Sequence, residues 1–232
     1  MKPALSIIIP TLNEAIGIQE LLLSLAPLRK KGCEIIVIDG GSRDRTKEIA
    51  SPHADSVINA PKGRAFQMTT GAEKANSDIL LFLHADTFLP DDAINLILKG
   101  IDKGHHWGRF DIQLTGNHSI LKLIALMMNW RSRLTGIATG DQGIFVTKKA
   151  FEEVGRFPEI ALMEDIAISK KLKLLGKPYC ITEKVTSSWR RWEKHGVFRT
   201  MVLMWILRLM YFLGANPEKL ALIYSRGFVW KR

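Results

Sequence analysis

Three short runs of apolar residues, each followed by polar or turn-forming residues, stand out in the first half of the chain. They are Leu5–Ile9, Glu34–Ile38 and Ile79–Leu83. Each run is too short for a typical buried helix and is apolar at nearly every position. This pattern is typical of parallel strands that are covered on both faces. We therefore predict three buried strands.

Between and after these strands the apolar residues recur at helical spacing. Thr11 and Glu14 have the spacing of a capping box, which predicts that the first helix begins beside them. Strands that alternate with helices indicate βαβ units and a mainly parallel sheet, that is, an α/β fold. The residues that the spacing places inward are Ile18, Leu21, Leu22, Leu25 and Leu28, then Ala65, Met68, Ala72 and Ala75, then Ile94, Ile97, Leu98 and Ile101.

The second half of the chain is less regular. Residues 107–114 alternate in part, which indicates an edge strand or a strand of a mixed sheet. We also predict helices at 119–134 and 164–175 and a strand at 143–147. Because no repeat, low-complexity tract or linker interrupts the pattern, we predict one domain over residues 1–196 and a helical segment over 197–232.

Polar or glycine-rich segments follow all three predicted strands, at 10–14, 39–42 and 84–87. In an open parallel sheet, ligands bind beyond the carboxyl ends of the strands. Asp39 there can accept hydrogen bonds from a nucleoside, and Gly41 permits close approach of the backbone. The alternatives are a simple tight turn for 39–42 and a helix cap for 10–14.

Carboxylates in two other places are candidates for chemistry. Asp86 follows a buried strand, with His84 two positions before it. A carboxylate there suits a divalent cation that also binds substrate phosphates, whereas the alternative is a solvated loop. Glu164 and Asp165 open a predicted helix, either as a general base or as a complement to the helix dipole.

Positive charge is concentrated near the end of the chain. The formal net charge is +10, and residues 184–232 hold ten Lys and Arg against two Glu. Such an excess suggests an anionic partner. Arg190 and Trp192 belong to a cationic and aromatic stretch that suits a diphosphate, or else a basic surface near a membrane.

The apolar run at 201–215 contains one charge, Arg208, and is too short to span a bilayer. It predicts a helix lying on an anionic membrane surface, with a core helix or a homodimer contact as alternatives. Cys33 and Cys180 lack metal-ligand spacing, and the first apolar run is too short for a signal peptide. We expect a cytoplasmic protein, peripheral on the inner face of the membrane.

The order of the segments resembles the family-2 glycosyltransferases of GT-A fold. The matching strings are SIIIPTLNE, VIDGGSRDRT, KGRAFQM, FLHADT, MEDIAISKKL and SWRRWEKHG, over about residues 4–196. His84 stands where many relatives carry an aspartate. The resemblance implies a nucleotide-binding half over about residues 1–90 and an acceptor half over residues 91–196.

The resemblance also implies roles for individual residues. Asp165 is the expected catalytic base, with Glu164 beside it, and a divalent metal, Mn²⁺ or Mg²⁺, is expected to be held mainly by Asp86, with His84 as a further candidate ligand. Arg190 and Trp192 are expected near the diphosphate and the acceptor. The residues expected to bind a UDP- or GDP-sugar donor are Pro10, Thr11, Asn13, Glu14, Asp39, Gly41, Lys62, Arg64 and Asp86.

These expectations combine into inverting transfer of a sugar to a hydroxyl acceptor, with a lipid or lipid-linked acceptor as one option. A nucleotidyltransferase of related fold is the nearest rival, but it would carry a glycine-rich loop with a lysine directly after the first strand. A non-catalytic basic membrane-binding protein would leave Asp39, Asp86 and Asp165 unexplained. We expect no nucleic-acid partner.

Overall fold

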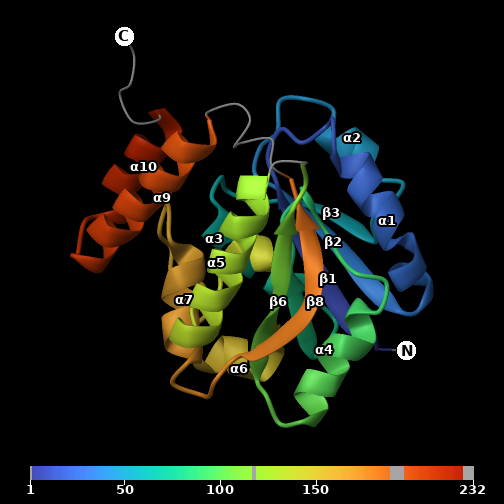
Figure 1. Cartoon of the computed structure of the whole chain (residues 1–232). Helices are drawn as coiled ribbons and strands as arrows, with labels where there is room; N and C mark the ends of the chain where they lie inside the picture. The colour runs from blue at the N-terminus through green and yellow to red at the C-terminus, as the bar shows by residue number, and fades with distance from the viewer. Residues whose placement is uncertain (1, 117–118, 189–195, 227–232) are drawn as a thin grey trace.

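A single twisted sheet, flanked by helices on both faces, forms the body of the molecule (Figure 1). The computed structural model describes residues 2–116, 119–188 and 196–226. The strands within these ranges are β1 (Leu5–Thr11), β2 (Cys33–Asp39), β3 (Ser56–Asn59), β4 (Ile79–Phe82), β5 (Thr87–Phe88), β6 (Trp107–Leu114), β7 (Ile144–Thr147) and β8 (Tyr179–Ser187). The helices are α1 (Ile18–Lys30), α2 (Thr46–Ala50), α3 (Arg64–Lys74), α4 (Ala93–Asp102), α5 (Ser119–Thr135), α6 (Lys148–Glu153), α7 (Glu164–Leu172), α9 (Val197–Phe212) and α10 (Pro217–Arg226), with the 3-10 helix η1 (Gly140–Gln142).

The sheet has the strand order β3-β2-β1-β4-β7-β6-β8-β5. The first four strands in this order are parallel, as the alternation of strands and helices predicts. Strand β7 is antiparallel to both β4 and β6, and β8 is parallel to β6. The predicted α/β class is therefore confirmed. Residues 107–114 form a strand of the mixed part of the sheet, and not an edge, because β6 lies between β7 and β8.

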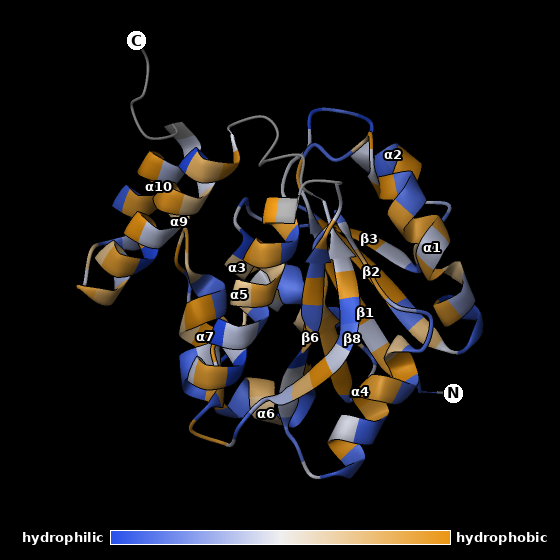
Figure 2. Cartoon of the chain, viewed as in Figure 1, coloured by the Kyte–Doolittle hydropathy of each residue, from blue (hydrophilic) through white to orange (hydrophobic). Residues whose placement is uncertain are grey.

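The pleat of the central strands divides the core into two layers. Ile7 and Ile9 of β1 pack with α1 and α4 on one face, whereas Ile8 packs with α3, α6 and α7 on the other. Successive side chains of a strand point to opposite faces, so a strand that is apolar at every position serves both layers. Figure 2 shows the resulting apolar colour along β1 and β2.

The inward faces predicted for α1 and α3 are confirmed, because all nine of the named residues are buried. The predicted capping box is wrong. Thr11 is the last residue of β1, and α1 begins later, at Ile18, with Gly17 at its N-cap and no side-chain cap. The backbone N–H of Glu14 instead donates to Thr46 Oγ1 at 2.8 Å, which ties this loop to the start of α2.

Helices α9 and α10 form a hairpin beside α7 and α5, at the upper left of Figure 1. Leu207 of α9 and Leu220 of α10 are buried in a small third core. Its partners on the body are Leu162, Met163 and Ile166, at the start of α7. Of the helices in the described ranges, none has the length and hydrophobicity to cross a bilayer.

Candidate active site

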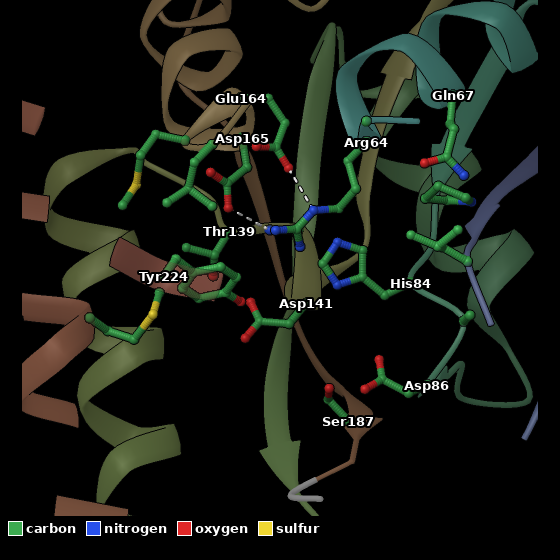
Figure 3. Close-up of a pocket in the computed structure, with 18 of the residues that line it drawn as sticks. Arg64, Gln67, His84, Asp86, Thr139, Asp141, Glu164, Asp165, Ser187 and Tyr224 are labelled. Carbon is green, nitrogen blue, oxygen red and sulfur yellow. Dashed lines mark hydrogen bonds and ion pairs between the residues drawn. The ribbon is translucent and has the colours of Figure 1, made fainter. Parts of the chain in front are cut away.

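A pocket of about 520 Å³ opens beyond the carboxyl ends of β1 and β4 (Figure 3). This volume is in the range of small-molecule sites. Its walls come from the end of β1, the start of α3, the segment after β4, η1, the start of α7, the end of β8 and the C-terminal hairpin. Segments far apart in the chain therefore meet where an open parallel sheet binds its ligands.

Most of the residues that the sequence nominates line this pocket. They are Pro10, Thr11, Glu14, Lys62, Arg64, His84, Asp86, Glu164 and Asp165. Three nominated residues, Asn13, Asp39 and Gly41, are not among its lining residues. Arg190 and Trp192 lie outside the described residues.

Asn13 and Asp39 organise the loops next to the pocket. Asn13 has a left-handed backbone, its N–H donates to Ser42 Oγ at 2.8 Å, and its Oδ1 accepts the N–H of Arg43. Asp39 Oδ2 accepts the N–H groups of Gly41 and Ser42, each at 2.9 Å. The turn expected as an alternative at this position is thus present.

The second oxygen of Asp39 differs from the first. Asp39 is fully buried, and its Oδ1 has no hydrogen-bond partner among the described residues. Asp39 also pairs with Thr11 across the parallel strands, and Thr11 lines the pocket. A buried acceptor without a partner is costly, so this oxygen is suited to receive a donor group from a ligand.

Gln67 connects the ends of β1 and β2 beneath the pocket. Its Nε2 donates to the carbonyl oxygens of Thr11 and Ile38, both at 2.8 Å. The Thr11 carbonyl oxygen also accepts the backbone N–H of Gly40 at 2.9 Å, so Gln67 is a second donor to it at the end of β1. The sequence reasoning assigned no role to Gln67, although it belongs to the KGRAFQM string.

Glu164 and Arg64 form an ion pair in the pocket wall, with 3.1 Å between Glu164 Oε1 and Arg64 Nε. The Glu164 side chain is 5% exposed, and its burial raises the pKa of its carboxyl group despite the neighbouring guanidinium. Met163, at the N-cap of α7, has a φ of 71°. This unfavourable conformation turns the chain so that Glu164 and Asp165 begin a helix at the pocket.

Asp165 is held by two backbone donors. Its Oδ2 accepts the N–H of Gly140 at 3.0 Å, and its Oδ1 accepts the N–H of Ile166 at 2.7 Å. The first bond fixes η1 against α7. Asp165 remains half-buried at the pocket wall, whereas Glu164 is buried against Arg64.

Asp141 is a further carboxylate of the pocket, and the sequence reasoning missed it. Burial raises the pKa of Asp141, and its Oδ1 has no hydrogen-bond partner among the described residues. Figure 3 shows its side chain between Tyr224 and His84. Asp86 could be nominated because it follows the carboxyl end of a predicted parallel strand. No strand ends directly before Asp141, so its sequence position does not indicate that it lies in the pocket.

His84 is uncharged at neutral pH in this environment. Burial, and then the Arg64 guanidinium, lower the pKa of His84 to about 3. Its Nε2 is buried without a hydrogen-bond partner and lies against Gly140, where an added Cβ would approach Nε2 to 2.3 Å. A neutral imidazole has a free lone pair, which a metal ion requires.

The pocket suits a divalent ion that a substrate helps to hold. Over the described ranges, no three His, Cys, Asp or Glu side chains are arranged as a complete metal site. Mg²⁺ and similar ions are often bound through one or two carboxylates plus substrate phosphates. Asp86 fits that pattern, with its carboxylate beside Ser187 in the lower part of Figure 3.

The C-terminal hairpin supplies one wall of the pocket. Thr200, Met204 and Arg208 of α9 and Tyr224 of α10 line it. The three α9 residues are spaced by four positions, so they share one face of the helix. The sequence predicted a helix on a membrane surface for this segment, with a core helix or a homodimer contact as alternatives, and it assigned no role in the site to Arg208.

Comparison with known proteins identifies relatives for most of the chain. Residues 6–150 match the family described as "Glycosyl transferase family 2". A poly-beta-1,6-N-acetyl-D-glucosamine synthase of Staphylococcus epidermidis is 27% identical over 194 residues, covering 73% of this chain and 46% of the relative. The Staphylococcus aureus enzyme of that name is 26% identical over 182 residues, 71% of this chain and 44% of the relative. The chain thus spans about half the length of these curated relatives.

Solved structures share the fold at lower identity. The mannosyltransferase PcManGT of Pyrobaculum calidifontis, in complex with GDP-Man and Mn²⁺, has a TM-score of 0.68 at 18% identity, covering 97% of this chain and 69% of that one. S. aureus TarS 1-349 has a TM-score of 0.66 at 20% identity, covering 81% and 60%. Glucosyl-3-phosphoglycerate synthase of Mycobacterium tuberculosis, with Mn²⁺ and UDP-Glc, has a TM-score of 0.56 at 16% identity, covering 78% and 69%.

Proposed function

The chain belongs to glycosyl transferase family 2, and from this premise we propose that it transfers a sugar from a UDP- or GDP-sugar to a hydroxyl acceptor with inversion at the anomeric carbon. One observation carries the proposal. Asp86 and Asp165, from the segment after β4 and the start of α7, line one pocket together with the cations Lys62 and Arg64. Such a pocket can hold a diphosphate on one side and activate a hydroxyl group on the other.

The donor half of the pocket has groups for each part of a nucleoside diphosphate. Asp39 Oδ1, beside Thr11, is a buried acceptor that suits an N–H of the base or a ribose hydroxyl. Lys62 and Arg64 supply positive charge for the phosphates. Asp86, with the neutral His84 nearby, would hold a divalent ion. When bound, that ion stabilises the negative charge that develops on the leaving diphosphate.

The proposed base is Asp165 rather than Glu164. Glu164 is buried and already paired with Arg64, so it positions that guanidinium for the phosphates. Asp165 is oriented by two backbone N–H groups at the pocket wall. It takes the proton of the acceptor hydroxyl as the oxygen attacks the anomeric carbon and the bond to the diphosphate breaks.

The test compares Asp165→Asn with the wild type and with Asp78→Asn, a matched change at a carboxylate that is 78% exposed. We expect Asp165→Asn to bind UDP or GDP with Mn²⁺ normally, as a rise in melting temperature. We expect it to lose about 10²–10⁴-fold in Mn²⁺-dependent turnover across a panel of nucleotide-sugars. Full turnover by a folded Asp165→Asn protein would refute the assignment.

A second variant separates this function from the rivals. Asp86→Asn should abolish the Mn²⁺-dependent part of UDP or GDP binding and leave the fold intact. A nucleotidyltransferase would instead release pyrophosphate from a nucleoside triphosphate and a sugar phosphate. A basic membrane-binding protein would show no metal-dependent nucleotide binding at all.

We also propose that the protein binds a membrane surface, where a lipid or lipid-linked acceptor would be found. Helices α5 and α9 each expose an apolar face, and the side chains are Ile120, Leu123, Leu126, Met127, Trp130 and Leu134 on α5 and Phe198, Trp205, Leu209 and Phe212 on α9. Contiguous exposed apolar surface marks an interaction site. The net charge of +10 favours an anionic bilayer as its partner, with the protein peripheral on the cytoplasmic face.

Vesicle sedimentation tests the membrane proposal. Phe212→Ser, at a side chain that is 77% exposed, should lower binding to phosphatidylglycerol vesicles, whereas Leu174→Ser, at one that is 86% exposed and lies outside the two faces, should not. Equal binding of both variants would remove the membrane from the proposal. A stable dimer in solution that Phe212→Ser dissociates would assign the face to a second copy of the chain.

A further inference from the structure

Two guanidinium groups, from Arg131 of α5 and Arg208 of α9, lie near the hairpin wall of the pocket, and Asp141 is a carboxylate on which both of their charges act. Among the ion pairs of the described residues, none involves either arginine. Nε and Nη2 of Arg131 and Nε of Arg208 are buried and have no hydrogen-bond partner there. Burial, and then the charge of Arg208, lower the pKa of Arg131 to about 10, as expected for two close cations.

The hydroxyl group of Thr200, on the same face of α9 as Arg208, is another donor without a partner among the described residues. Thr200 is 5% exposed, and its Oγ1 is buried with no hydrogen bond among the described residues. It lies two helical turns before Arg208 on the face of α9 that lines the pocket. The face of α9 that lines the pocket thus presents two donors, Thr200 Oγ1 and Arg208 Nε, that the described part of the protein does not satisfy.

Such an arrangement is unfavourable unless a ligand completes it. Each buried donor without a partner lowers the stability of the protein, and charged donors lower it more. Arginine is also the side chain best matched to phosphate and carboxylate groups. A bound anion would satisfy the donors and relieve the repulsion between the two guanidinium groups.

The position of the two arginines points to the acceptor rather than the donor. Asp141 and Asp165 are the carboxylates that act on Arg131, whereas Arg64 is acted on by Glu164, Asp165 and Asp141 and also by Asp86. Arg131 therefore lies close enough to the proposed base, Asp165, for the two charges to interact, and Arg208 lines the same pocket as that base. Burial raises the pKa of Asp141, although the charges of Arg208 and Arg131 act in the opposite direction.

We propose that Arg131, Arg208 and Thr200 form a subsite for an anionic group of the acceptor, a phosphate or a carboxylate, so that the acceptor hydroxyl is presented to Asp165. This inference rests on the proposed function. The same group can come from a membrane lipid or from a soluble phosphorylated acceptor. Arg208 lines the pocket and binds the group directly, and Arg131 adds charge from behind it.

The experiment measures binding of glycerol 3-phosphate, with glycerol as the neutral control, by the shift in melting temperature of the full chain. It is done without nucleotide and again with saturating Mn²⁺ and UDP or GDP. The variants are Arg208→Gln and Arg199→Gln, which remove the same charge from α9. Arg199 is an exposed residue that does not line the pocket.

We expect glycerol 3-phosphate, but not glycerol, to raise the melting temperature of the wild type and of Arg199→Gln, with nucleotide bound or absent. Arg208→Gln should weaken that binding at least tenfold while it keeps the shift caused by nucleotide and Mn²⁺. Vesicles of phosphatidylglycerol and of phosphatidylcholine form the second arm. If Arg208→Gln binds phosphatidylglycerol vesicles more weakly than Arg199→Gln does, and binding to phosphatidylcholine vesicles is unchanged, the anionic group comes from a lipid.

Two results would overturn the inference. In the first, Arg208→Gln binds glycerol 3-phosphate as tightly as Arg199→Gln does, and it also binds phosphatidylglycerol vesicles to the same extent. The other is displacement of glycerol 3-phosphate by UDP or GDP, which would assign the arginines to the donor. If Mn²⁺ with UDP or GDP does not raise the melting temperature of the wild type, the proposed function is refuted. The role of Arg208 is still tested in that case, because binding of glycerol 3-phosphate is also measured without nucleotide.

Discussion

Asp111, in the middle of β6, carries the counter-charge for two arginines, and its replacement tests how β6 is attached to α5. Its Oδ1 pairs with Arg109 Nη1, and its Oδ2 pairs with Arg133 Nη2 at 2.7 Å. The Arg109 side chain is completely buried, whereas that of Arg133 is 35% exposed. Arg109 also donates to the carbonyl oxygen of Asn129, which connects β6 to α5.

The isosteric change Asp111→Asn should lower the free energy of unfolding by about 3–5 kcal/mol, the cost of leaving a buried charge without its partner. The amide cannot substitute for the carboxylate. Its NH₂ group must face one of the two guanidinium groups, which have donors only. Arg133→Gln should lower the free energy of unfolding by no more than about 1 kcal/mol, since water can solvate the Asp111 oxygen that loses its partner. The double replacement Arg109→Met with Asp111→Leu should recover most of the loss, because no buried charge is left.

Urea denaturation followed by circular dichroism measures these differences. With an m-value of about 3 kcal/mol/M, Asp111→Asn should lower the midpoint by roughly 1–1.7 M without a change in slope. If Asp111→Asn costs as little as Arg133→Gln at an unchanged m-value, Arg109 is not a buried charge that depends on Asp111. The account of how β6 holds α5 would then be wrong.

Three further predictions follow from close contacts and burial. Gly71→Ala should destabilise the protein by about 1–3 kcal/mol in the same urea assay, because the new Cβ would lie 2.4 Å from Ile8 Cγ2. Gly140→Ala, whose Cβ would lie 2.3 Å from His84 Nε2, should weaken Mn²⁺-dependent nucleotide binding by displacing the imidazole, and unchanged affinity would contradict the position of that ring. Burial raises the pKa of Cys33 from 9.0 to about 11, so the unfolded thiol ionises first and stability should fall between these pH values, by on the order of 2 kcal/mol. Cys33→Ala should remove this pH dependence, as measured by urea denaturation from about pH 8 to about pH 11.

The sequence predicts those elements whose cause is local. Strands β1, β2 and β4 are apolar at nearly every position because both of their faces are covered, and this leaves a plain signal. Strand β8 leaves no such signal. Phe110 pairs with Ile181 but Asp111 pairs with Lys184, so residues 182 and 183 bulge out and break the alternation. Strand β5 has two residues and is recognisable only through its pairing with β8.

The same distinction explains which residues of the pocket could be predicted. Asp86 follows a buried strand, and the rule for the carboxyl ends of parallel strands is enough to nominate it. Asp141 and Ser187 reach the pocket through tertiary contacts, η1 against α7 and the end of β8 beside β5. Neither position carries a local pattern that distinguishes it from an ordinary polar residue.

Helix α9 shows why the C-terminal segment was the hardest part to interpret. It is apolar on opposite faces, so its sequence lacks the one-sided pattern of a surface helix. Leu207 is buried against the body, whereas Trp205 and Phe212 are exposed. The family match ends at residue 150, before α7, β8 and α9. Asp165, the proposed base, and Thr200 and Arg208 of the proposed anion subsite therefore lie beyond the matched residues, whereas Arg131 lies within them. Family membership accounts for the segments proposed to bind the donor, and the choice of acceptor has to be read from the packing of α7 and α9 in this chain.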